Sequence, residues 1–182
     1  MDRSELIAQI PALRRYARAL TGNAWAADDL VQDTLERACS KWRLWAAGSD
    51  LRAWLFTLMH NLFVNQLRHS SRQAGLATPL DIDALPEPLA APDAGQEQRL
   101  DMQRCLLRLP QDQRAVLLLV SVEYMSYEET ARIVGAPVGT VMSRLSRART
   151  RLRELMNSPA QTSATAALAG SSPNVSALRR LN

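Results

Sequence analysis

Cysteine, histidine and long apolar runs are all scarce in this chain of 182 residues. Its two cysteines, Cys39 and Cys105, are too few to form a disulfide framework, which fits the reducing cytoplasm, where we expect the protein to act. The longest apolar run, Ala115 to Val120, is far shorter than the ~20 residues that cross a bilayer. The N-terminal residues do not form a secretory signal. These features argue against membrane insertion and against a secreted scaffold.

Catalytic and metal-binding motifs are missing as well. His60 and His69 are the only histidines, and neither stands at a zinc-binding spacing from a cysteine. The chain has no glycine-rich phosphate loop and no nucleophile elbow. We therefore predict that the protein is not an enzyme, and we expect no catalytic residue, metal site, cofactor or small-molecule substrate.

What the chain has is arginine, distributed unevenly. The formal net charge is +4, but residues 75–98 contain five acidic side chains and no basic one, while residues 1–74 and 99–156 each contain ten basic side chains. Lys41 is the only lysine, and the planar guanidinium of arginine suits phosphate oxygens and guanine edges. A genome rich in G and C would favour arginine equally, so composition alone does not identify the partner.

Apolar residues recur at helical spacing through both basic blocks, without β-type alternation of useful length. Residues 6–20 and 24–42 are predicted to be helices, and Thr21-Gly22-Asn23 ends the first and caps the second. Asp50 is predicted to cap a third long helix. The inward-facing stripe of this helix is predicted to consist of Leu51, Leu55, Leu58 and Leu62.

Four prolines and five unbalanced acids set residues 75–98 apart and predict a flexible, extended linker. The predicted fold is all-α, with two small helical domains, at residues 1–74 and 99–156, joined by this acidic linker. Residues 157–182, which are rich in Ala, Ser, Thr and Pro, are predicted to be a largely disordered tail.

The second domain contains a predicted helix-turn-helix. Ser126 and Glu129 form a capping box, Gly135 ends the first helix, and Pro137 opens the second. The buried stripe of the second helix is predicted to be Val141, Leu145, Ala148, Leu152 and Leu155. Beside it lie five arginines within ten residues, opposed only by Glu154. A charge run is usually a solvated face, but its attachment to a well-formed turn favours DNA binding through the major groove.

The third helix is a second candidate for nucleic-acid contact. Its polar positions accumulate toward its C-terminal end, and aromatic side chains lie near its start, a combination that single-stranded nucleic acid can use by stacking. Trp42 and Trp54 are more simply explained as core residues, whereas Trp45, in the loop before the helix, is predicted to be exposed.

These segments resemble a known family. The runs Asp28-Asp-Leu-Val-Gln-Asp-Thr-Leu-Glu-Arg37 and Leu51-Arg-Ala-Trp-Leu-Phe-Thr-Leu-Met-His-Asn61 resemble the second conserved region of bacterial RNA polymerase sigma factors. The run Leu109-Pro-Gln-Asp-Gln-Arg114 and the helix-turn-helix resemble their fourth region. The short, two-domain layout is similar to the extracytoplasmic-function group.

The resemblance implies three sets of site residues. Docking on the β′ coiled coil of core polymerase is implied for Asp28, Asp29, Gln32, Asp33 and Glu36. Contact with the minus-ten element, where a flipped base and the melted strand are held, is implied for Asn61, Asn65, Arg68 and Arg72. Contact with the minus-thirty-five element is implied for Val138, Gly139, Thr140, Ser143, Arg144 and Arg147.

The implied partners are core RNA polymerase, through its β′ coiled coil and β flap, promoter DNA, and an anti-sigma factor. The acidic linker would thread through polymerase near the template-strand and RNA paths. Two alternatives stay open. One is a sigma-like decoy that sequesters an anti-sigma protein, although it would need neither basic DNA-binding surface. The other is a free-standing helix-turn-helix regulator, which would leave the first domain unexplained.

Overall fold

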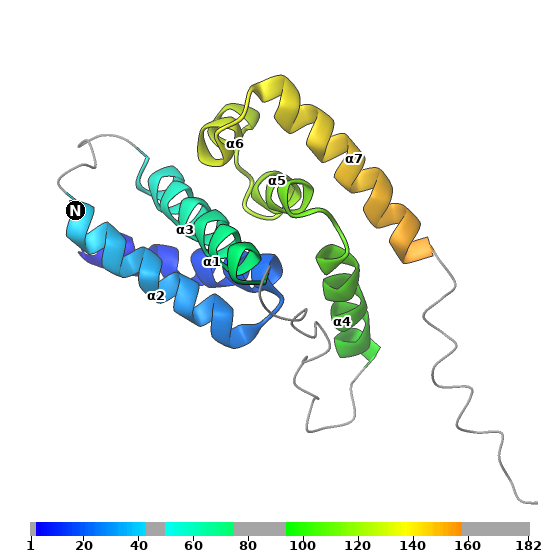
Figure 1. Ribbon diagram of the computed structural model, residues 1–182, viewed down its shortest axis with the longest axis horizontal. Coiled ribbons are helices and arrows are strands. Elements are labelled where there is room, and N and C mark those ends of the chain that lie inside the picture. Colours follow the sequence, from blue (N-terminus) through cyan, green and yellow to red (C-terminus); the bar gives the residue numbers. More distant parts are fainter. Residues whose placement is uncertain (1–2, 43–49, 75–93, 158–182) are drawn as a thin grey trace, which may run out of the picture.

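The computed structural model describes residues 3–42, 50–74 and 94–157, which are helical throughout apart from short connections (Figure 1). The helices are α1 (Arg3–Thr21), α2 (Ala24–Lys41), α3 (Leu51–Ala74), α4 (Ala94–Leu107), α5 (Gln111–Ser121), α6 (Tyr127–Val134) and α7 (Val138–Asn157). The all-α prediction is confirmed. Helix α4 begins inside the stretch predicted as linker, and the rest of that stretch lies outside the described residues, as does the tail beyond Asn157.

Local sequence signals set the helix boundaries. Gly22 adopts a φ of 75°, which ends α1, and the side chain of Asn23 accepts a hydrogen bond from the backbone N–H of Ala26 (3.0 Å) to start α2. Asp50 caps α3 by accepting a hydrogen bond from the backbone N–H of Arg52 (2.9 Å). These predicted caps are confirmed, because a cap depends on only a few neighbouring residues.

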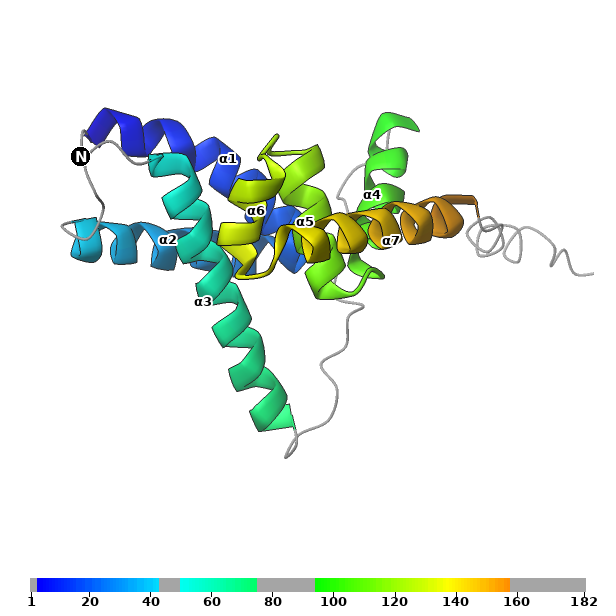
Figure 2. The same cartoon turned by 90° about the horizontal axis from the view of Figure 1, so that it is seen from above.

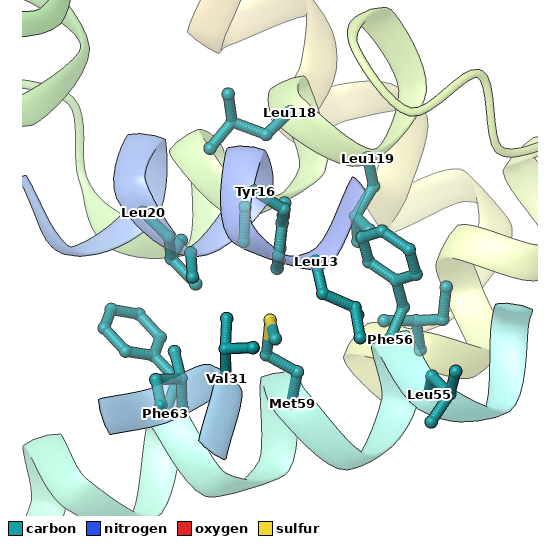
Figure 3. Packing of buried hydrophobic residues seen from close by; sticks show 14 of the residues in the cluster. Leu13, Tyr16, Leu20, Val31, Leu55, Phe56, Met59, Phe63, Leu118 and Leu119 are labelled. Carbon is teal, nitrogen blue, oxygen red and sulfur yellow. The ribbon is translucent and has the colours of Figure 1, made fainter. Parts of the chain in front are cut away.

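Helices α1–α3, called here the first block, and α4–α7, the second block, share one hydrophobic core. Leu13, Tyr16 and Phe56 of the first block are almost fully buried, and Leu118 and Leu119 of α5 join their cluster. Figure 3 shows these two leucines reaching from α5 over α1. The rings of Tyr16 and Phe56 pack edge to face, with 5.2 Å between their centroids. The two blocks are therefore held together by apolar burial.

Helix α5 explains the most apolar segment of the sequence. Leu118 and Leu119 face the shared core, while Val116 and Leu117 face a separate cluster that belongs to the second block alone. Residues 115–119 are all buried. An unbroken apolar run is needed because this helix is covered on both sides.

The buried face of α3 differs from the predicted stripe. Leu55 is buried as predicted, but Leu51, Leu58 and Leu62 are only half-buried, and the other buried apolar positions are Phe56, Met59 and Phe63. Helix α3 packs against α2 on one side and against α6 on another, which moves its buried face by about one residue. Figure 2 shows its C-terminal half projecting away from the remaining helices.

Two glycines with positive φ allow a matched test of packing between the blocks. A Cβ at Gly22 would lie 2.6 Å from both δ-carbons of Leu107 in α4, whereas a Cβ at Gly135 (φ 63°) would meet nothing within 4 Å. We expect Gly135→Ala to lower the free energy of unfolding by about 1 kcal/mol, the cost of a left-handed alanine. Gly22→Ala should cost about 2–4 kcal/mol, because Leu107 must also move. Chemical denaturation measures both losses of stability. Equal losses for the two variants would show that the Leu107 side chain moves aside at no cost.

Candidate nucleic-acid and partner interfaces

The helix-turn-helix forms as the sequence predicts. The Ser126 hydroxyl accepts a hydrogen bond from the backbone N–H of Glu129 (3.1 Å), and the Glu129 carboxylate accepts one from the backbone N–H of Ser126 (2.8 Å). This hydrogen bonding lowers the pKa of the Glu129 carboxyl. Gly135 ends α6 in the left-handed conformation, and α7 follows after Pro137. The local geometry is that of a recognition helix presented by a short supporting helix.

One face of α7 is buried and the neighbouring face is basic. Val141, Leu145 and Ala148 are buried, as predicted, whereas Leu152 and Leu155 of the predicted stripe are only half-buried, because they lie toward the end of the helix. Of the six residues predicted to lie nearest DNA, Gly139, Ser143 and Arg147 are exposed, whereas Val138, Thr140 and Arg144 are half-buried. All six lie in the first half of α7. Gly139 and Ser143 have small side chains, so this end of the helix can approach a surface closely.

Arg144 is already engaged within the protein. Its guanidinium forms an ion pair with Asp112 of α5 at 3.0 Å, and 30% of its side chain is exposed. Use of Arg144 on DNA would therefore require the release of Asp112. Nothing in the sequence pattern indicated this pair, because the two residues lie on different helices.

The polar face of α3 runs from the middle of the helix into its C-terminal half. Asn61, Asn65 and Arg68 are exposed on it. Arg72 belongs to the same helix, but its side chain lies outside the described residues. The three described residues recur at intervals of three and four and so share one face.

Of the two tryptophans predicted to be core residues, one packs against the core and the other is exposed. Trp54 is half-buried and packs against the shared core, as predicted. The prediction of a core position for Trp42 is wrong: its side chain is 46% exposed. Trp42 is the C-cap of α2 and lies one turn beyond Ala38, the last buried residue of this helix, so the core does not extend to it. Trp45 lies outside the described residues.

The acidic face of α2 is largely open to solvent. Asp28, Asp29, Gln32 and Glu36 are exposed, and Gln32 donates a hydrogen bond to Glu36 (3.0 Å). Asp33 differs, because it is half-buried and accepts a hydrogen bond from Gln66 of α3 (3.2 Å). Four of the five predicted docking residues therefore share an exposed surface, on which Asp28 also pairs with Arg14 and Arg18 of α1 (3.5 and 4.0 Å), and the fifth, Asp33, ties α2 to α3.

Two of the predicted DNA-contacting residues, Arg68 of α3 and Arg144 of α7, line one cavity of about 380 Å³. Arg68 and His60 of α3 line it from one side, and Arg144 with Asp112 lines it from the other. One residue of each predicted DNA surface thus lies beside the same cavity, although α3 packs mainly against α2 and α6 and the other exposed residues of both surfaces stay open. This arrangement was not predictable, because the lining residues come from helices far apart in the chain.

A buried acid clamps the two blocks together beside the shared core. Glu123, which follows α5, is fully buried. Arg15 of α1 donates two hydrogen bonds to its carboxylate (both 2.9 Å), and Arg52 of α3 donates a third (2.7 Å). The hydrogen bonding to Glu123 raises the pKa of the Arg15 guanidinium. We call this trio the Glu123 clamp; sequence reasoning missed it because its members are far apart in the chain.

His60 makes the packed arrangement sensitive to acid. Burial, and secondarily the charge of Arg144, lower the pKa of His60 to about 4, against 6.5 in an unfolded chain. The folded protein therefore binds fewer protons than the unfolded chain between these values, so stability falls as the pH drops from 6.5 toward 4. We expect this histidine to remove about 2 kcal/mol of the free energy of unfolding by pH 4.5.

Denaturation of the wild type and of His60→Gln at pH 7 and pH 4.5 measures this effect. The glutamine variant should lose less stability on acidification than the wild type. His69→Gln is the matched control, because His69 is exposed on the same helix. Equal acid sensitivity of wild type and His60→Gln would contradict the assignment.

No group of three histidine, cysteine or carboxylate side chains in the described part of the chain could hold a metal ion. None of the described helices is long and apolar enough to cross a membrane.

Two family models match the chain. A model described as the sigma2 domain of PhyR matches residues 6–60, and a model described as sigma-70, region 4, matches residues 99–152. The first covers α1, α2 and the start of α3, and the second covers the helix-turn-helix. Both fall on the segments whose motifs carry the resemblance.

The similarity extends over most of the chain. The ECF RNA polymerase sigma factor EcfG of Rhodopseudomonas palustris is 41% identical over 157 residues, which cover 85% of this chain and 84% of that protein. SigE of Mycolicibacterium smegmatis, also an ECF RNA polymerase sigma factor, is 36% identical over 78% of this chain and 56% of its own length.

Solved structures give the same result. The sigma factor RpoE of Bartonella quintana, in complex with the anti-sigma factor NepR, is 37% identical, with a TM-score of 0.74 over 85% of this chain and 95% of that one. The anti-anti-sigma factor PhyR of the same organism, complexed with NepR, shares the fold at 21% identity and a TM-score of 0.54 over 83% of this chain and 50% of that one.

Proposed function

Because the chain belongs to the extracytoplasmic-function group of RNA polymerase sigma factors, we propose that it binds core RNA polymerase, directs it to specific promoters and helps melt the minus-ten region. The observation that carries the proposal is the presence, in one chain, of an open basic recognition helix and a separate polar helix face on α3. The protein would supply specificity and binding energy, without covalent chemistry, in the cytoplasm.

The recognition helix α7 is assigned to the minus-thirty-five element. Its N-terminal half combines the exposed Arg147 with the slim positions Gly139 and Ser143, which lets the helix enter a major groove. A bidentate arginine–guanine pair discriminates against other bases by ~1–3 kcal/mol. A few such contacts select a sequence but bind weakly alone, so the second block would rely on core polymerase, including its β flap, for affinity.

The first block is assigned to the minus-ten element and to the enzyme. The melted strand would be held by Asn61, Asn65, Arg68 and Arg72 of α3. Flipping a base out of the stack costs a few kcal/mol, which contacts with these residues must offset. The exposed carboxylates of α2 would dock on the β′ coiled coil. Residues 75–98 would connect the two blocks through the polymerase.

This role requires the two blocks to separate. The names of the two promoter elements place them about 25 base pairs apart, which is roughly 85 Å of B-form DNA at 3.4 Å per base pair. In the packed arrangement Arg68 and Arg144 line a single cavity. One molecule in this arrangement would be unable to contact both elements, so it represents a form that is not engaged on a promoter.

An anti-sigma factor is the further partner that the relatives suggest. RpoE of Bartonella quintana was solved with NepR, and CnrH, 26% identical with a TM-score of 0.62, was solved with the cytosolic domain of CnrY. An anti-sigma factor that held the blocks together would keep the DNA-facing surfaces apart from DNA.

The alternative of a decoy deserves a specific test, because the first block matches the sigma2 domain of PhyR. A decoy would bind an anti-sigma protein without contacting DNA, so it would have no use for an open Arg147 face. The 41% identity to EcfG across most of both chains favours the sigma factor. A free-standing helix-turn-helix regulator would leave the α2 and α3 faces without a role.

Transcription in vitro distinguishes these functions. The full chain is added to core polymerase with a library of genomic fragments, and RNA starts are mapped. A sigma factor gives promoter-dependent transcripts that share upstream sequence elements. A decoy gives none, and instead releases transcription by another sigma factor from inhibition by an anti-sigma protein.

A further inference from the structure

Trp25, in the first turn of α2, is the most exposed large hydrophobic side chain in the described part of the chain, with 87% of its surface accessible. None of the predicted site residues explains it. A tryptophan left in water forgoes the burial that stabilises most large apolar residues. Tryptophan is also enriched among the residues that dominate binding energy at protein interfaces. Its position therefore points to a partner.

The helical spacing places Trp25 on the acidic face of α2. Asp28 and Asp29 follow it by three and four residues, Gln32 by seven and Glu36 by eleven, so these side chains form one continuous stripe. Trp25 heads this stripe one turn before its first carboxylate. It is thus an extension of the surface assigned to core polymerase.

The stripe borders a cavity of about 490 Å³ between α1 and α2. Apolar groups from Ile10 and Leu35 line it together with the ring of Trp25, and Asp29 and Glu36 lie at its acidic side. The one basic residue in its lining, Arg14, already pairs with Asp28 at 3.5 Å. The cavity therefore offers an apolar interior beside carboxylates, which complements a basic, amphipathic helix.

We propose that Trp25 anchors a basic helix of core RNA polymerase on α2. An apolar side chain of that helix enters the cavity against the indole, and its arginine or lysine side chains pair with Asp29 and Glu36. A guanidinium that lies over the indole face gains a cation–π contact as well. The inference rests on the proposed function, which assigns this face of α2 to core polymerase, and adds an apolar anchor to it.

Affinity for core polymerase tests the proposal directly. The full chain and its Trp25→Ala variant compete with labelled wild type for core enzyme in the absence of DNA. We expect Trp25→Ala to bind roughly 10- to 30-fold more weakly, the loss typical of an aromatic hot spot. Trp25→Tyr, which retains a ring, should lose less. Tyr124→Ala is the matched control, because it removes an equally exposed ring (85%) that does not line this cavity.

A second measurement does not depend on affinity. A photo-crosslinking phenylalanine analogue in place of Trp25 should attach to a core subunit in the assembled enzyme. Wild-type affinity of Trp25→Ala and no crosslink would overturn the inference and leave the proposed function standing. Loss of anti-sigma binding with unchanged core binding would also overturn it. Failure of the wild type itself to bind core enzyme would contradict the proposed function before any variant is measured.

Discussion

Replacing both Arg15 and Arg52 by alanine is expected to separate the two blocks and to lower the free energy of unfolding by about 3–5 kcal/mol. Glu123 is fully buried, whereas 53% of the Arg15 side chain and 32% of the Arg52 side chain are exposed. The desolvation cost of the clamp therefore falls mainly on the carboxylate. Without its two arginines, this carboxylate must be left unpaired, take up a proton or reach water by opening the interface.

Denaturant unfolding and small-angle X-ray scattering measure the two consequences, lower stability and a larger radius of gyration. Adding Glu123→Gln to the double variant is the control, because a neutral amide is less costly to bury than an unpaired carboxylate. The triple variant should regain part of the loss. A double variant as stable and compact as the wild type would show that the clamp does not hold the blocks together.

Arg147→Ala is expected to have the largest effect on DNA recognition, a 5- to 150-fold loss of affinity for the cognate upstream element if Arg147 reads a guanine, which corresponds to ~1–3 kcal/mol. Arg147 is exposed on the α7 face that is free to enter a groove. Arg144→Ala should cost less, because Arg144 must first leave Asp112, 3.0 Å away, before it can contact DNA.

Fluorescence anisotropy with cognate and altered upstream elements measures this difference. A base contact is lost only on the cognate sequence, whereas a phosphate contact is lost equally on all sequences and lowers the salt dependence. Arg108→Ala, which removes an exposed arginine outside the helix-turn-helix, is the control. Both α7 variants should retain their affinity for core enzyme. Loss of core binding instead would mean that this face of α7 binds the enzyme.

Features that depend on neighbouring residues were predictable from the sequence. The capping box of Ser126 and Glu129, the left-handed Gly135 and the first three positions of the buried stripe of α7 all follow from side chains a few positions apart, and the structure confirms them. The predicted roles on DNA and polymerase stay predictions. Their residues lie on three faces, of α2, α3 and α7, and such roles depend on partners outside the chain.

Features that depend on packing between distant segments were not predictable. The buried face of α3 is shifted because α6 covers part of it, and Trp42 is exposed because the core along α2 ends one turn earlier, at Ala38. The Glu123 clamp joins residues from three parts of the chain. No periodicity marks a single buried acid, so only the assembled fold shows which arginines surround it.

The central claim is that one chain holds its two blocks together when free and separates them along a promoter. Energy transfer between dyes on Ala8→Cys of α1 and Thr150→Cys of α7, both exposed positions, tests it after Cys39 and Cys105 are replaced by serine and alanine. The transfer efficiency should be high for the free protein and should fall sharply when core polymerase and promoter DNA are added together. An unchanged efficiency in an active initiation complex would contradict the account.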